Sequence, residues 1–142
     1  MHIVDVLRRK GDDVVTIAPD RTVRDLIELL GAHGVGAAVV STDGSTVEGI
    51  VSERDVVRRL RSDGDAVLDS EVGAIMTAEV HTCEPSSTLE DLMGVMTERR
   101  IRHVPVLRDG VLAGIVSIGD VVKHRMAEVE SERDQLSSYI SG

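Results

Sequence analysis

A nine-residue motif occurs twice in this chain of 142 residues, and the repeat limits the folds that the chain can adopt. Residues 49–57 (GIVSERDVV) return as residues 114–122 (GIVSIGDVV). Each copy begins with a glycine and two β-branched residues, which favour a buried strand, and continues with a serine, which caps helices well. Each copy is therefore predicted to be a strand that runs directly into a helix N-terminus. Free amides and the helix dipole favour an anion at such a junction.

The repeat extends well beyond the motif. Residues 14–19 match residues 80–85, residues 22–26 match residues 88–92, and Asp-Gly turns lie at residues 43–44 and 109–110. The offset is 66 residues up to the turn and 65 residues after it. A repeat of this length indicates two copies of one supersecondary unit rather than a solenoid. We expect two half-domains, residues 1–66 and 67–126, that bury their apolar faces against each other.

Each unit is predicted to fold as strand, helix, strand, strand and helix, which gives an α/β (α+β) protein. Strands are expected at residues 14–17, 35–40, 47–51, 80–83, 103–107 and 112–116. Helices are expected from Thr22, from Ser52 to about Leu60, over residues 88–99 and from Ser117.

Three further segments lie outside the repeated order. A short helix over residues 4–10 precedes the first unit, and a polar connector over residues 61–71 separates the units. Residues 127–142 are predicted to be a C-terminal helical extension. A narrow apolar stripe runs from Met126, just before the extension, to Ile140, which favours a packing or dimerisation arm.

Composition excludes several function classes. The net charge of −9 argues against binding of DNA or RNA through a broad basic face. The single cysteine, Cys83, fits a reducing cytoplasm and a place in the core. The sequence has no apolar run long enough to predict a membrane span. The five histidines show no metal-ligand spacing, and neither serine motif resembles a catalytic nucleophile. We therefore expect a cytoplasmic protein that is not an enzyme and holds no metal.

The basic residues are clustered in spite of the acidic net charge. They gather after the first motif, before the second and after it: Arg54, Arg58, Arg59 and Arg61; Arg99, Arg100, Arg102 and His103; and Lys123, His124 and Arg125. Such clusters are either solvated helix faces or a local pocket for a small anion.

The doubled order, with Gly-hydrophobic-x-Ser-x-x-Asp at the end of each unit, resembles the cystathionine β-synthase (CBS) domain pair, or Bateman module, of the stand-alone bacterial type. Residues 75–77 (IMT) and 100–106 (RIRHVPV) also match the pattern of that family. The resemblance covers about residues 4–126. It implies two repeats related by a pseudo-two-fold axis, with two clefts between them that bind adenine nucleotides in many members.

The same resemblance implies which residues would bind the ligand. The motif aspartates Asp55 and Asp120 would accept hydrogen bonds from the ribose hydroxyls. The residues near the ribose and phosphate would be Ser52 with Arg54, and Ser117 with Gly119. The phosphate itself would be reached by Arg102 and His103. The edge of the adenine ring would meet backbone groups of Val14, Thr16, Val80 and Thr82.

The two clefts are not expected to be equal. Where the second repeat has Arg102 and His103, the first has Gly36 and Ala37, and Ala37 is counted among the expected ligand-binding residues. Our hypothesis is that the cleft of Asp120, Arg102 and His103, with Arg54 reaching across, binds the nucleotide more tightly.

A purely structural interpretation competes with the ligand-binding one. Ser-x-x-Asp is close to a helix capping box, in which both side chains bind first-turn amides. Arg54 and Arg102 can equally be solvated, and His103 can be a partly buried histidine with its own partners.

The predicted function is that of a non-catalytic sensor of energy or redox state, which binds AMP, ADP, ATP or NADH as a homodimer with four repeats in a flat assembly. The alternatives are a ligand-free dimerisation or protein-interaction module and a binder of S-adenosylmethionine.

Overall fold

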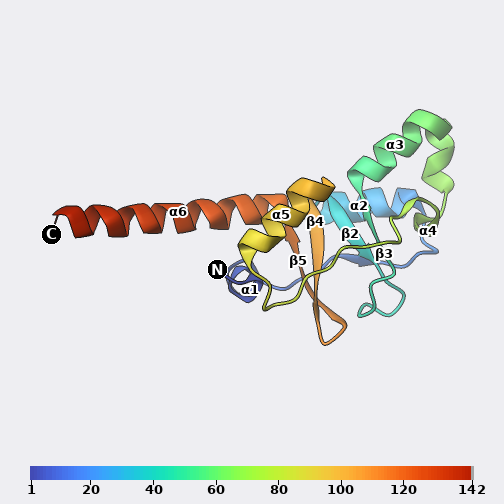
Figure 1. The fold of residues 1–142 in the computed structure, drawn as a ribbon. Helices are drawn as coiled ribbons and strands as arrows, with labels where there is room; N and C mark the ends of the chain where they lie inside the picture. Colours follow the sequence, from blue (N-terminus) through green and yellow to red (C-terminus); the bar gives the residue numbers. More distant parts are fainter. Residues whose placement is uncertain (142) are drawn as a thin grey trace.

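Two small sheets with their helices lie side by side in the computed structural model of the chain, which describes residues 1–141 (Figure 1). In chain order the elements are α1 (Ile3–Lys10), β1 (Thr16–Ile17), α2 (Val23–His33), β2 (Ala37–Val40), β3 (Gly49–Ser52), α3 (Glu53–Asp63), the 3-10 helix η1 (Gly64–Asp69), α4 (Val72–Ile75), α5 (Leu89–Arg99), β4 (His103–Arg108), β5 (Val111–Ser117) and α6 (Ile118–Ser141). This order confirms the predicted fold class and the doubling of one unit.

The helices begin at the hydroxyl side chains that the sequence predicts as caps. Thr22 Oγ1 accepts a hydrogen bond from the Asp25 amide at 3.1 Å, and Thr88 Oγ1 accepts one from the Asp91 amide at the same distance. Each bond satisfies an amide that has no partner inside the helix. Because this type of cap depends on neighbouring residues alone, the sequence predicts it well.

The segment between the repeats is more ordered than predicted. α3 continues to Asp63, beyond the expected end near Leu60, and stops before Gly64, whose φ of 67° lies outside the helical region. The expected polar connector over residues 61–71 then contains η1 instead of irregular chain.

One predicted strand is absent, and a proline accounts for its loss. In the first repeat β1 pairs in parallel with β2, and the Val39 amide donates to the Val15 carbonyl oxygen at 3.0 Å. The strand expected at residues 80–83 is wrong, because this described segment forms only an isolated bridge at Cys83. Pro105 takes the place of Val39 in the second repeat and has no N–H to donate. The second sheet therefore contains only the antiparallel pair β4 and β5.

Each repeat has a core of its own, and the short helices that precede the repeats exchange places. α1 contributes Ile3, Val6 and Leu7 to the core of the second repeat. α4, which precedes the second repeat, contributes Val72 and Ile75 to the core of the first. Burial of each such side chain is worth about 1.5–3 kcal/mol. The repeats are thus joined by exchanged helices, and their apolar side chains fill two clusters instead of facing each other across one shared layer as expected.

Candidate functional site

A cleft of about 440 Å³ opens between the two repeats and gathers most of the predicted site residues. Those that line it are Ala37, Ser52, Arg54, Asp55, Val80, Arg102, His103, Ser117 and Gly119. The first four belong to the first repeat and the others to the second, so a ligand in the cleft would touch both. The helices α3 and α6 both begin at the cleft, which places two helix N-termini beside it.

The motif serine and aspartate form the predicted cap in both repeats. Ser52 Oγ accepts from the Asp55 amide at 3.3 Å, and Asp55 Oδ2 accepts from the Ser52 amide at 2.8 Å and from its hydroxyl at 3.0 Å. Ser117 and Asp120 repeat this arrangement with distances of 3.2, 2.9 and 2.9 Å. The capping interpretation is confirmed, and it leaves the second oxygen of each carboxylate free of the cap.

The two aspartates differ in what else they bind. Lys10 Nζ, at the end of α1, donates to Asp120 Oδ2 at 2.6 Å and to the Ile115 carbonyl oxygen at 2.7 Å. Burial would raise the pKa of the Asp120 carboxyl, but the hydrogen bonds from Lys10 and Ser117 hold it below its ordinary value. Within residues 1–141, Asp55 bonds only to its own capping serine and has no lysine or arginine partner. Both motif aspartates therefore keep one oxygen for a ligand, and Asp55 differs in that no cationic side chain of the described residues competes for its carboxylate.

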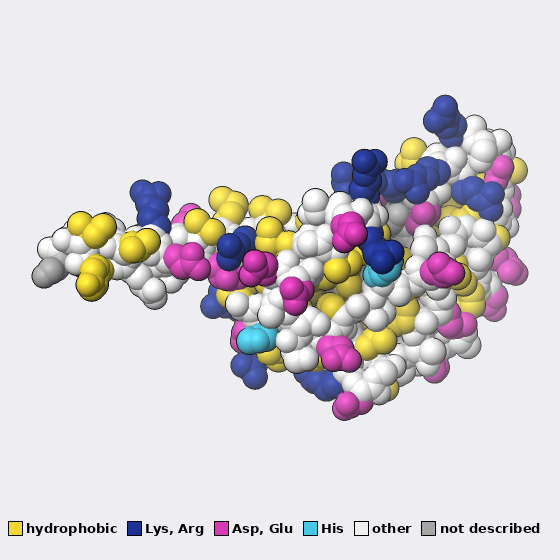
Figure 2. Space-filling view, viewed as in Figure 1, with side chains coloured by type: hydrophobic (Ala, Val, Ile, Leu, Met, Phe, Trp, Pro, Cys, Tyr) yellow, Lys and Arg dark blue, Asp and Glu magenta, His cyan; other side chains and the backbone are white. Residues whose placement is uncertain are grey.

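Four arginines line the cleft without a carboxylate partner. Arg54, Arg58, Arg100 and Arg102 form no ion pair within 4.0 Å in the part of the chain that the structure describes. Figure 2 shows basic side chains gathered around α3 on this face of the molecule. The carboxylates of Glu53, Asp55 and Glu79 also line the cleft, so it is mixed in charge. Guanidinium groups that are not engaged elsewhere suit phosphate oxygens.

Arg100 has an unusual backbone conformation for a side chain at a cleft. It follows α5 with φ 55° and ψ 43°, in the left-handed region. The matching position of the first repeat, 66 residues earlier, is Gly34, which caps α2 with φ 61°. Glycine adopts this conformation freely, whereas the same conformation costs free energy in a residue with a Cβ. The second repeat thus carries an arginine at the cleft in a position that favours glycine.

His103 lies at the junction of the two repeats. A Cβ built on Gly36 would be 3.8 Å from His103 Cε1 and 3.2 Å from Glu53 Oε1, so the histidine ring lies close to the first repeat. Burial lowers the pKa of His103, Lys10 and Arg102 act in the same direction, and Glu53 and Asp120 oppose them. His103 is consequently neutral above its ordinary pKa of about 6.5.

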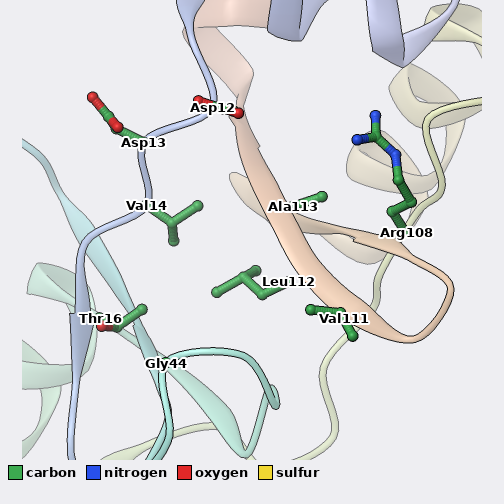
Figure 3. Close-up of a pocket in the computed structure, with 9 residues that line it drawn as sticks. All are labelled: Asp12, Asp13, Val14, Thr16, Gly44, Arg108, Val111, Leu112 and Ala113. Carbon is green, nitrogen blue, oxygen red and sulfur yellow. The ribbon is translucent and has the colours of Figure 1, made fainter.

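Four of the predicted site residues lie outside the cleft: Asp120, Val14, Thr16 and Thr82. Val14 and Thr16 line a separate cavity of about 500 Å³, between the segment that follows α1 and the β4–β5 hairpin (Figure 3). Thr82 is exposed and lines neither cavity. The structure therefore groups Arg102 and His103 with Asp55, whereas the sequence analysis grouped them with Asp120.

Four lining residues with polar side chains were missed from the sequence, namely Glu53, Thr77, Glu79 and His81, whereas Arg58 and Arg100 were named only as members of the basic clusters. Comparison of the two repeats could have found Arg100, since it replaces the glycine that ends the corresponding helix. Among residues 1–141, no group of three or more His, Cys, Asp or Glu side chains is placed to hold a metal ion. No helix of the described chain is both long and apolar enough to cross a membrane.

Known proteins show the same sequence pattern and the same fold. The sequence profile of the CBS domain matches residues 3–62 and 72–127. A mitochondrial CBS domain-containing protein of Arabidopsis thaliana is 37% identical over 148 aligned residues, which cover 99% of this chain and 72% of that protein. The crystal structure of a CBS-domain-containing protein from Agrobacterium tumefaciens matches with a TM-score of 0.85 and 48% identity, over 88% of this chain and 99% of that one. A CBS domain protein of Pyrobaculum aerophilum, solved in complex with AMP, matches with a TM-score of 0.75 and 27% identity, over 84% of this chain and 89% of that one.

Proposed function

Because the chain belongs to the CBS domain family, we propose that it is a non-catalytic regulatory module that binds an adenine nucleotide in the cleft between its repeats. The observation that carries this proposal is the cleft itself. It brings together a motif carboxylate that only its own cap occupies, two helix N-termini and four arginines without carboxylate partners. The AMP complex of the Pyrobaculum aerophilum protein supports the ligand class.

Each part of a nucleotide has a counterpart in the cleft. The free carboxylate oxygen of Asp55 accepts from the ribose hydroxyls, because an ionised carboxylate accepts two such bonds well. The adenine ring lies among aliphatic side chains such as Ile50, and its edge meets the backbone near Val80. The phosphates lie at the helix N-termini, within reach of the arginines.

This assignment reverses the ranking that the sequence suggested. Lys10 already donates a strong charge-assisted bond to Asp120 Oδ2 at 2.6 Å, so much of the charge of that carboxylate is compensated before a ribose binds. No lysine or arginine in the part of the chain that the structure describes compensates the charge of Asp55. We therefore propose that the cleft of Asp55 is the principal nucleotide site, and that Arg102 and His103 serve it.

The number of arginines bears on which nucleotide binds. A single phosphate can be held by one or two guanidinium groups, and the cleft offers four. We expect ADP, ATP or a dinucleotide such as NADH to bind more tightly than AMP. S-adenosylmethionine has no phosphate and would leave the arginines unused.

Regulation would follow from a population shift. The proposed ligand contacts Asp55 in the first repeat and Arg102 in the second, so it favours the arrangement of the repeats in which both contacts form. A homodimer with four repeats in a flat assembly, and an effector protein that reads the arrangement, belong to the same proposal. So does a cytoplasmic location.

A thermal-shift screen with AMP, ADP, ATP, NADH and S-adenosylmethionine tests the proposal. Ligand at 100 times its dissociation constant stabilises the fold by about 2.7 kcal/mol. For a chain of this length the midpoint should rise on the order of 5–10 °C. A shift with none of the five would reject the proposal in favour of a ligand-free interaction module. A shift with S-adenosylmethionine alone would reject the phosphate assignment.

A further inference from the structure

The C-terminal half of α6 extends away from the body of the protein (Figure 1). Its buried residues, Val121 and His124, lie near its beginning, and every described residue from 129 onward is exposed. Isolated helices shorter than about 12–15 residues are marginal in water. This half of α6 has little tertiary packing of its own, so a partner helix would add to its stability.

One face of α6 is covered by the protein and the opposite face is free. On the side that faces the body, Val121 and His124 are buried and the Glu128 carboxylate lies 3.8 Å from the N-terminal amine of Met1. The free face carries large apolar side chains with exposed fractions as follows: Val122 49%, Met126 59%, Val129 48%, Leu136 62% and Ile140 80%. Figure 2 shows hydrophobic side chains along this helix from the body to its end.

These apolar residues have the spacing of a coiled-coil seam. With Arg133, they follow one another at alternating steps of four and three residues (122, 126, 129, 133, 136 and 140). This is the a/d pattern of a heptad repeat, in which residues 126, 133 and 140 are a positions and residues 122, 129 and 136 are d positions. A globular helix would instead carry a broader apolar face turned toward its own core.

We propose that this stripe pairs with the same stripe of a second copy of the chain in a parallel, two-stranded coiled coil. The charges beside the seam favour this arrangement. In the parallel register Arg125, at a g position, faces Glu130 of the partner subunit, at an e position, and the reciprocal pair forms as well. Arg133, at a central a position, lies beside Glu132 of the partner subunit. A single polar a position also fixes the register.

Other occupants fit the stripe less well. An antiparallel pair that overlaps the whole stripe would bring Glu130 toward Glu130 of the partner subunit and Glu132 toward Glu132 of the partner subunit, and these like charges repel. A membrane surface is disfavoured because α6 carries five acidic and three basic residues, which gives no attraction to anionic lipids. The inference does not depend on the proposed nucleotide site.

Disulfide cross-linking tests the arrangement in the full chain. With Cys83→Ala as background, Leu136→Cys places a thiol at a d position, where two parallel copies come within the Cα separation of about 4.4–6.8 Å that a disulfide requires. Ser138→Cys is the matched control, because residue 138 lies on the opposite face of the same turn. Mild oxidation should convert most of the Leu136→Cys chains to a covalent dimer and leave the Ser138→Cys chains without a covalent link.

Three outcomes would overturn the proposal: equal linking of the two variants, no linking of either, or linking only in mixtures of Met126→Cys and Leu136→Cys chains, which would show an antiparallel pair. A second measurement avoids thiols. Leu136→Glu should lower the helical signal in far-ultraviolet circular dichroism, because the unpaired half of α6 unfolds, whereas Ser138→Glu should preserve it. Equal spectra for these two variants would also reject the coiled coil.

Discussion

Replacement of Arg100 by glycine should stabilise the fold while it weakens nucleotide binding. Arg100 adopts φ 55° after α5, and relief of a left-handed conformation is worth about 1–2 kcal/mol. Glycine also has more conformational entropy in the unfolded chain, which reduces this gain in stability by about 0.4–1 kcal/mol. The net gain is on the order of 0.5–1 kcal/mol, which corresponds to a rise in the melting midpoint of roughly 1–4 °C. Loss of a charge-assisted bond to phosphate, worth about 1.5–3 kcal/mol, should weaken ATP binding about tenfold or more.

Arg99→Gly is the matched control for this prediction. Arg99 is the last residue of α5 and does not line the cleft, so its replacement by glycine should cost up to about 1 kcal/mol and leave ATP affinity unchanged. Thermal unfolding and titration calorimetry of both variants measure the two effects. The reasoning about backbone strain is refuted if Arg100→Gly lowers the midpoint as Arg99→Gly does. The role of Arg100 at the cleft is refuted if its loss leaves the affinity for ATP unchanged.

Three further changes test particular contacts. Lys10→Met should lower the free energy of unfolding by about 1.5–3 kcal/mol at pH 7, because it removes the charged partner of Asp120. Because the pKa of Asp120 is lowered in the fold, the difference in free energy of unfolding between the two proteins should persist above the ordinary carboxyl pKa of about 3.9 and disappear as the pH falls below it. Denaturant titrations at several pH values would measure this difference. The pKa of His103 is also lowered, so the unfolded chain takes up the proton first as the pH falls, and the free energy of unfolding should decline below about pH 6.5. The melting midpoint of His103→Gln should decline less than that of the unchanged protein over the same pH range. Identical pH profiles for the two proteins would contradict this. Gly49→Ala should cost about 1–3 kcal/mol, since its Cβ would lie 2.5 Å from the nearest side-chain sulfur, whereas Gly31→Ala, which meets nothing within 4 Å, should be neutral or stabilising in the same melting experiment.

The parts of the fold that depend on neighbouring residues could be predicted from the sequence. The repeated motif predicted the strand-to-helix junctions, and the hydroxyl caps at Thr22 and Ser52 were expected from local chemistry and are present. The missing strand at residues 80–83 depends on which backbone group faces Pro105 across the sheet. That information requires the register of two strands, and a pattern of apolar residues does not supply it.

The composition of the cleft could be predicted only in part, because distant segments complete it. Lys10 and Asp120 are 110 residues apart in the chain, and their contact follows from the exchange of α1 onto the second repeat. The sequence alone does not show this exchange, so it predicts equivalent surroundings for the two motif aspartates. The conformation of Arg100 was accessible in principle, because its counterpart is Gly34 and glycine commonly ends helices in the left-handed region.

Titration calorimetry of ATP with Asp55→Asn and Asp120→Asn tests the central claim most directly. Asparagine keeps an oxygen for the helix cap, so both variants are expected to fold, although Asp120→Asn also loses the ion pair with Lys10. We predict that Asp55→Asn weakens ATP binding at least about tenfold, which corresponds to about 1.4 kcal/mol, and that Asp120→Asn changes the affinity little. Abolished binding in Asp120→Asn with unchanged binding in Asp55→Asn would contradict the account and place the nucleotide at the other motif.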